Sequence, residues 1–145
     1  MNTGVRIELT WGGETIYLAG PMSGYAEFNF PRFAAVTKAL RYFGHVVFSP
    51  AEADIERHGY DISKGNDKGD VALATANHNF AIRDALGADL SFICHRATAV
   101  AFLPGWELSF GSLSEWSTAV ALKKNNESMS LFYLTERECL AMERM

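Results

Sequence analysis

Apolar runs of four or five residues recur along the chain, and most of them end at Gly, Pro or Ser. Runs of this length are typical of strands that are buried on both faces of a sheet. They predict four strands, over Thr15–Ala19, His45–Phe48, Ala99–Leu103 and Leu131–Leu134. We expect an additional edge strand over Val5–Trp11.

Between these runs, apolar residues recur every three or four positions, which is the spacing of an amphipathic helix. This spacing predicts a helix over Phe30–Phe43, with Pro31 in its first turn and Gly44 as its stop. Another helix begins near Phe80, and further helices are expected over Ser112–Lys124 and close to the C-terminus. The helix that begins near Phe80 carries one apolar stripe, made of Ile82, Leu86, Leu90 and Ile93.

A polar stretch over Ala51–Asn79 is interrupted by Gly59, Gly65 and Gly69. It is longer than most connections inside a compact domain. We therefore expect either a mobile lid or a short helix around Val71–Ala76. The stretch is also expected to cover the binding site and to select its ligand.

The alternation of strands and helices predicts one α/β domain over residues 1–145, built as a three-layer sandwich around a mostly parallel, Rossmann-like or flavodoxin-like sheet. In such sheets ligands bind beyond the carboxyl ends of the strands. This rule selects three loops, Gly20–Asn29, the segment from Pro50 onward, and Pro104–Gly111.

Composition and charge narrow the classes of function. The chain has 145 residues and a formal net charge of −4, so it lacks the basic excess of a DNA- or RNA-binding protein. It has no apolar run near the roughly 20 residues that span a bilayer, and its start does not resemble a signal peptide, so we expect a cytoplasmic protein without membrane contact. Cys94 and Cys139 predict neither a disulfide nor a zinc site, and the four histidines lack metal-ligand spacing. We expect no metal and no cofactor.

The loop after the first strand contains Gly20 and Gly24, which allow a ligand to approach the backbone. Met22, Ser23 and Asn29 in the same loop are candidate substrate contacts. The loop matches neither the dinucleotide-binding nor the Walker pattern, and composition alone favours a Gly-Pro turn with solvated polar residues.

The loop after the third strand offers more chemistry. Ser109 and Gly111 precede a helix whose N-terminal amides form an anion site, and Glu115 is expected in the first turn of that helix. Asp89, in the preceding helix, supplies a second carboxyl group. Two carboxyl groups with separate roles are the minimal equipment for breaking a glycosidic bond. Glu115 also has a purely structural explanation, because the helix dipole favours an acid near the N-terminus of a helix.

Two tryptophans, Trp106 and Trp116, flank this loop and the start of the helix after it. Their indole rings either stack on a planar base or pack in the core.

The segments IYLAGPMSG, FNFPRF, SPAE and LPGWELSFGSLSE, in this order, resemble the nucleoside 2-deoxyribosyltransferase-like superfamily, closest to a branch of small bacterial and phage proteins related to nucleoside 5′-monophosphate N-glycosidases. The resemblance covers about Ile16–Leu134. It implies that Glu115 attacks or stabilises the sugar C1′, that Asp89 acts on the leaving base, and that Tyr17 steadies Glu115. It also implies that Ser109 binds a 5′-phosphate, where transferases of free nucleosides carry an aspartate.

Two positions depart from the superfamily pattern. The nucleotide hydrolases place a basic residue in the first loop, where this chain has Ser23. Arg32, Arg57 and Arg83 are the candidate replacements. Many relatives carry an aspartate where this chain has Thr98, a position that we interpret as structural.

The expected function is therefore cleavage of the N-glycosidic bond of a purine or pyrimidine (deoxy)nucleoside 5′-monophosphate, by a hydrolase or a deoxyribosyltransferase. The alternative is a binding module that sequesters a nucleotide or a nucleotide-derived signal. By resemblance we also expect a homodimer or a larger homo-oligomer. Four aromatic residues are expected at its exposed contact surface, namely Phe28, Phe30, Trp106 and Trp116.

Overall fold

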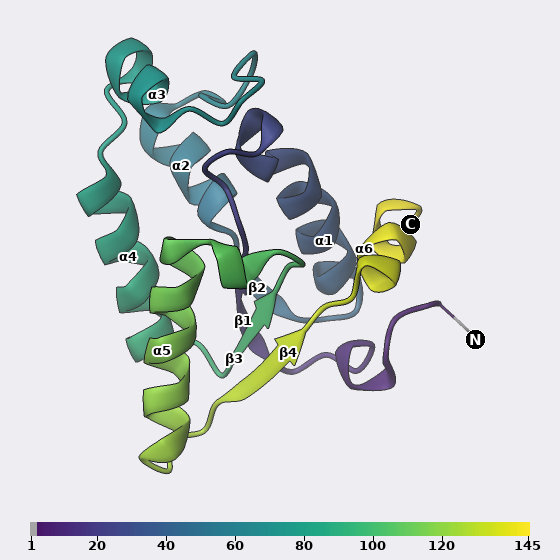
Figure 1. Cartoon of the computed structure of the whole chain (residues 1–145). Coiled ribbons are helices and arrows are strands. Elements are labelled where there is room, and N and C mark those ends of the chain that lie inside the picture. Colours follow the sequence, from purple (N-terminus) through teal and green to yellow (C-terminus); the bar gives the residue numbers. More distant parts are fainter. Residues whose placement is uncertain (1–2) are drawn as a thin grey trace.

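A four-stranded sheet forms the centre of the computed structural model, which describes residues 3–145 (Figure 1). Its strands are β1 (Thr15–Ala19), β2 (Val46–Phe48), β3 (Ala99–Phe102) and β4 (Ser130–Tyr133), in the order β2-β1-β3-β4. Every pairing within the described chain is parallel. The predicted strands and the flavodoxin-like α/β fold are confirmed, and the sheet, predicted to be mostly parallel, is parallel throughout.

Six α-helices are present in residues 3–145. They are α1 (Phe30–Tyr42), α2 (Pro50–His58), α3 (Val71–His78), α4 (Ile82–His95), α5 (Phe110–Lys124) and α6 (Glu136–Glu143). Short 3₁₀ helices cover Ile7–Leu9, Ala26–Asn29 and Trp106–Leu108. No helix in the described part of the chain is long and apolar enough to cross a bilayer.

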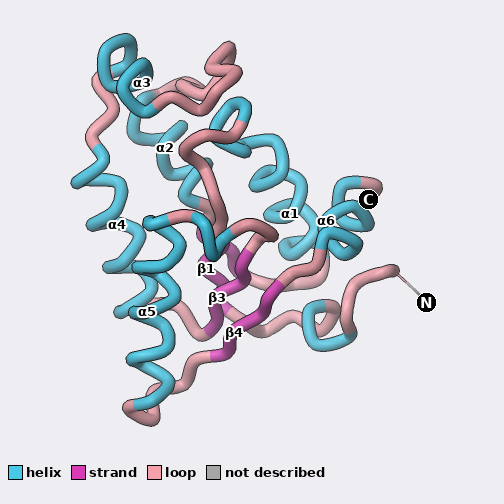
Figure 2. The backbone as a smooth tube through the Cα atoms, viewed as in Figure 1, coloured by secondary structure: helices cyan, strands magenta, loops and turns pink. Residues whose placement is uncertain are grey.

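The helices form the outer two layers of a sandwich. α1 and α6 cover one face of the sheet, and α4 and α5 cover the other (Figures 1 and 2). Because successive side chains of a strand point to opposite faces, Ile16 and Leu18 of β1 pack toward α1, whereas Tyr17 and Ala19 pack toward α4 and α5. The predicted three-layer arrangement is confirmed.

The polar stretch after β2 contains two helices, of which the sequence indicated only α3. α2 begins at Ser49, whose hydroxyl accepts a hydrogen bond from the Glu52 N–H (3.4 Å), and ends at Gly59 with φ +77°. Its buried face holds few apolar side chains, because Asp54 occupies one of the buried positions. A periodicity of apolar residues therefore could not show it.

The segment between α2 and α3 lies against the loop that follows β1. The Gly24 N–H donates to the Gly69 carbonyl (2.9 Å), and the Glu27 N–H donates to the Asn66 carbonyl (2.8 Å). A Cβ at Gly69 would lie 2.2 Å from the Tyr25 carbonyl oxygen, so only glycine permits this approach. The polar stretch thus braces the first loop through its backbone.

The edge strand predicted over Val5–Trp11 is wrong. This segment forms the 3₁₀ helix Ile7–Leu9, and Leu9 is fully buried among core residues. The Leu9 carbonyl oxygen lies 2.8 Å from His45 Nε2, which holds the turn against the chain just before β2. The apolar residues of this segment therefore anchor a turn to the core.

Candidate active site

One pocket lies at the carboxyl ends of β1 and β3, where the strand order reverses and open parallel sheets bind their ligands. About 770 Å³ of space lies inside it, counted out to its open mouth. All three predicted loops contribute to its walls. The lining residues are Tyr17, Gly20, Met22, Ser23, Phe28, Phe30, Pro50, Asp54, Ile62, Val71, Phe80, Ile82, Ala85, Leu86, Asp89, Ser109, Gly111, Ser112 and Glu115.

Eight of the ten predicted site residues line this pocket, and Gly24 and Asn29 do not. The Asn29 side-chain amide donates to the Pro21 carbonyl (3.1 Å), and the Gly24 N–H is bonded to the Gly69 carbonyl. Both residues therefore stabilise the conformation of the first loop without lining the pocket. Asn29, Phe28 and Glu27 have positive φ angles of 62°, 53° and 49°, which turn the chain sharply into α1.

Tyr17 and Glu115 form a buried pair between β1 and α5. The Tyr17 side chain is fully buried, and its hydroxyl donates a short hydrogen bond to Glu115 Oε2. Its ring stacks on Phe48 of β2 with 5.6 Å between ring centroids, which fixes the direction of the hydroxyl. Glu115 lies in the second turn of α5, one turn deeper than predicted, because the helix begins at Phe110.

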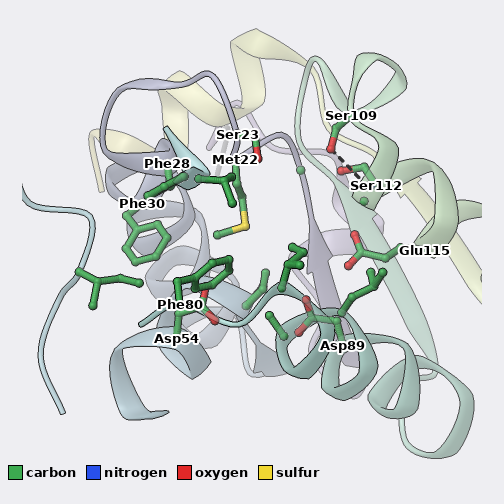
Figure 3. A pocket seen from close by; sticks show the side chains of 18 of the residues that line it. Met22, Ser23, Phe28, Phe30, Asp54, Phe80, Asp89, Ser109, Ser112 and Glu115 are labelled. Carbon is green, nitrogen blue, oxygen red and sulfur yellow. Dashed lines mark hydrogen bonds between the residues drawn. The ribbon is translucent and has the colours of Figure 1, made fainter. Parts of the chain in front are cut away.

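Asp89 approaches the same space from α4 (Figure 3). It occupies a position on the inward face of the helix between Ala85 and Ile93, both of which are buried. Only 8% of Asp89 is exposed, and its Oδ1 is sealed from solvent without a hydrogen-bond partner. An unpaired buried oxygen costs about 1–3 kcal/mol, so this atom is poised either to carry a proton or to meet a ligand.

Burial raises the pKa of both carboxyl groups. Desolvation raises the pKa of Glu115 to about 8, and it raises the pKa of Asp89 to about 7, where the charge of Asp54 adds to it. The Tyr17 hydroxyl opposes the rise at both groups. The pair therefore holds at least one proton near neutral pH. The residues are almost equally buried, with 6% of Glu115 and 8% of Asp89 exposed. They differ in their hydrogen bonds, because Glu115 Oε2 accepts from the Tyr17 hydroxyl, whereas Asp89 Oδ1 has no donor.

The N-terminus of α5 forms the polar end of the pocket. Ser109 caps the helix, because its hydroxyl oxygen accepts a hydrogen bond from the Ser112 N–H (3.3 Å), drawn as a dashed line in Figure 3. The Ser112 hydroxyl is buried at 1% exposure without a partner. Gly111 and Ser23 also line this part of the pocket. The first amides of a helix have no acceptor inside it and carry a partial positive charge, so this end suits an anion.

None of the three arginines considered as replacements for a basic residue in the first loop lines the pocket. Arg32 pairs with Glu136 and Glu143 of α6, and Arg57 pairs with Asp54. Arg83 is exposed and lies outside the lining. Among residues 3–145, the pocket lining contains no cationic side chain.

The opposite end of the pocket is aromatic and apolar. Phe28, Phe30 and Phe80 line it (Figure 3). The expectation that Phe28 and Phe30 are exposed is wrong, since their exposed fractions are 6% and 5%. The left-handed turn before α1 directs both rings inward.

Trp106 and Trp116 lie outside the pocket lining and pack against each other with 6.0 Å between ring centroids. They are half-buried against the core on the α5 face of the sheet, so the packing alternative describes them.

The remaining candidates have structural surroundings. The Thr98 hydroxyl accepts a hydrogen bond from the Thr15 N–H and donates to Glu14, both at 2.8 Å, at the far end of the strands from the pocket. Cys94 and Cys139 are free cysteines. No cluster of His, Cys, Asp and Glu suited to a metal ion occurs in the described part of the chain.

Comparison with known proteins gives one match. A family model described as a domain of unknown function, DUF4406, matches residues 14–126. Neither the curated proteins nor the solved structures contain a significant match.

Proposed function

We propose that this chain, which belongs to the DUF4406 family of domains of unknown function, cleaves the N-glycosidic bond of a (deoxy)nucleoside 5′-monophosphate. The observation that carries the proposal is the carboxyl pair, in which Tyr17 holds Glu115 while Asp89 keeps an unpaired buried oxygen in the same pocket. The sequence resemblance supports a further assignment of the chain to the nucleoside 2-deoxyribosyltransferase-like superfamily. That superfamily uses this set of residue types for this reaction.

The order of groups along the pocket matches the order of groups in a nucleotide. Ser109 and Ser112 lie beside Glu115 at one end, and Phe28, Phe30 and Phe80 lie at the other (Figure 3). A phosphate at the start of α5 places the sugar next to the carboxyl pair and the base among the aromatic rings. A carboxylate at position 109 would repel the phosphate, whereas a hydroxyl and helix amides attract it.

The proposed reaction uses the form of the pair that carries one proton, on Asp89, and one charge, on Glu115. As the C1′–N bond breaks, its electron pair moves to the base nitrogen, and the Asp89 acid gives that base a proton. The Glu115 carboxylate meets the positive charge that develops at C1′, either as a nucleophile or as an electrostatic stabiliser. Water or a second base then forms the new bond to C1′ and gives its proton to the Asp89 carboxylate, while any bond from C1′ to Glu115 breaks with its electron pair returning to the carboxylate. The choice of acceptor decides between a hydrolase and a deoxyribosyltransferase. Activity requires one proton on the pair, so the rate should pass through a maximum as the pH changes.

One observation favours the second candidate, a module that binds a nucleotide or a nucleotide-derived signal without cleaving it. The lining of the pocket contains no cation among the described residues, although a phosphate contributes two negative charges. Hydroxyl groups and helix amides suffice to hold a phosphate, so this candidate explains the polar end. It does not explain two buried carboxyl groups, which raise the cost of bringing an anion into the same pocket.

The test is to incubate the protein with each common ribo- and deoxyribonucleoside 5′-monophosphate, with and without a second free base, and to measure released base by chromatography. We expect release from a monophosphate and much less from the matching nucleoside. Glu115→Ala should reduce release at least about a thousandfold, because it removes the group that faces C1′. Glu107→Ala, at an exposed position before the same helix, is the matched control.

Undiminished turnover in Glu115→Ala would contradict the mechanism. If no base is released while one nucleotide raises the melting temperature and is recovered intact, the binding module is correct.

A further inference from the structure

Asp54 is a third buried acid in the pocket, and the proposed reaction does not use it. It lies on the inward face of α2, and only 4% of it is exposed. Figure 3 shows it beside Phe80, at the aromatic end of the pocket. Burying a carboxylate among aromatic rings is unfavourable unless its oxygens have partners.

Only one of its two oxygens has a partner. Asp54 Oδ1 accepts a hydrogen bond from the Arg57 guanidinium, one turn further along α2. Oδ2 accepts no hydrogen bond in residues 3–145, and it is not among the buried polar atoms sealed from solvent. This oxygen therefore stays accessible and needs a hydrogen-bond donor.

The surroundings define which donor fits. Phe28, Phe30 and Phe80 supply flat apolar surface at this end, and Ile62 and Val71 are further apolar residues of the pocket lining. A planar heteroaromatic ring stacks on such surfaces and presents its polar groups at its edge. A ring that directs an exocyclic amino group at Asp54 gains a charge-assisted hydrogen bond, whereas a ring with a carbonyl at the same position directs a second acceptor at it.

We propose that Asp54 selects substrates whose base carries an exocyclic amino group, as cytosine and adenine do, over the carbonyl counterparts uracil and hypoxanthine. The placement of the base at this end rests on the proposed function. Arg57 holds Oδ1, so the free oxygen has a fixed direction. The inference therefore names the substrate class of the pocket and its specificity-determining residue.

A purely structural role makes a different prediction. If the Asp54–Arg57 ion pair only stabilises α2, Asp54→Asn lowers stability and leaves the discrimination between bases unchanged. An asparagine at this position can donate as well as accept, so our proposal requires the variant to lose its preference.

The experiment measures binding by calorimetry in the Glu115→Gln background, so that no ligand is consumed. Binding is measured instead of turnover because the charge of Asp54 also acts on Asp89. The ligands are two matched pairs, dCMP with dUMP and dAMP with dIMP. In each pair that binds, we expect the amino-bearing nucleotide to bind at least about tenfold more tightly. Asp54→Asn should reduce the ratio to about threefold or less, and Glu56→Gln, an exposed position on the same helix, should leave it unchanged.

The outcomes separate the two proposals. A ratio near one with Asp54 intact overturns this inference even if Asp54→Asn fails to fold, because that comparison needs no substitution at position 54. A ratio that survives Asp54→Asn overturns it as well. Failure of every nucleotide to bind instead contradicts the proposed function.

Discussion

Replacing Glu115 with glutamine should change how the stability of the protein depends on pH. The wild-type carboxyl group binds its proton more tightly in the folded chain than in the unfolded chain, because burial raises its pKa. Its contribution to stability is therefore fully present below the unfolded pKa of 4.5 and is lost as the pH rises through about 8. Glutamine keeps the shape and an acceptor for the Tyr17 hydroxyl, but it does not titrate.

The shift sets the size of the effect. The pKa of Glu115 moves from 4.5 to about 8, and each pKa unit corresponds to about 1.4 kcal/mol. The wild type should lose about 3 kcal/mol of stability through this group by pH 7, and about 5 kcal/mol once the pH is well above 8. Relative to the wild type, Glu115→Gln should therefore gain about 3 kcal/mol between pH 4.5 and pH 7.5.

The assay is urea unfolding of both proteins at several pH values, followed by circular dichroism. A fixed cost of the substitution cancels, because the prediction concerns only the change of the difference with pH. Glu107→Gln removes the same charge at an exposed position and serves as the control. If the free energies of unfolding of Glu115→Gln and the wild type run parallel from pH 4.5 to pH 7.5, Glu115 is not a buried acid with a raised pKa.

Two further variants test the roles around Glu115. Tyr17→Phe removes the hydroxyl that lowers the pKa of both Glu115 and Asp89, so the acid limb of the pH–rate profile should move to higher pH, and turnover at pH 6 should fall at least about tenfold. An unmoved acid limb would show that Tyr17 does not act on the ionisation of the pair. Ser109→Asp should shift kcat/KM at least about tenfold from nucleotides toward nucleosides, since a carboxylate at the start of α5 repels the phosphate. Ser117→Asp, at an exposed position further along the same helix, is its control. An equal preference in the two variants would show that no phosphate binds beside position 109.

The sequence was sufficient to predict the sheet and the helices that pack on it, because their signals are local. A run such as Thr15–Ala19 between Gly-rich turns has few alternatives to a buried strand. The spacing of Phe33, Val36 and Leu40, all buried against the sheet, shows α1 in the same direct way. The spacing of apolar residues did not predict α2, because the inward face of this helix carries the acid Asp54.

The candidate site could be predicted where a residue follows a strand, and it was missed where distant segments meet. Glu115 and Ser109 follow β3 in the chain, so the rule for parallel sheets indicated them. Asp54 lies in the segment from Pro50 onward, which the same rule selected, but nothing in the sequence distinguishes it from the other acids of that segment. Phe80 lies beyond α3, far along the chain from any strand end, and the rule gave no signal for it. Ser112 gave no signal, because a buried hydroxyl without a partner looks like any helical serine in the sequence.

The three acids of the pocket lie on three different helices, and this arrangement is costly. Arg57 compensates Asp54, whereas Glu115 and Asp89 have no cationic partner within the described chain and raise their pKa values instead. The total stability of a domain is typically about 5–15 kcal/mol, so the few kcal/mol lost by burying these acids are a large part of it. Packing alone does not explain this loss.

Neutral side chains of similar size would fill the same space with a smaller loss of stability. A pocket that only binds a phosphate ester would gain from that exchange, because any charge on the pair opposes its ligand. A pocket that breaks a bond at C1′ would lose its proton donor and its stabilising charge. The cost of the pair is therefore better explained by chemistry than by binding.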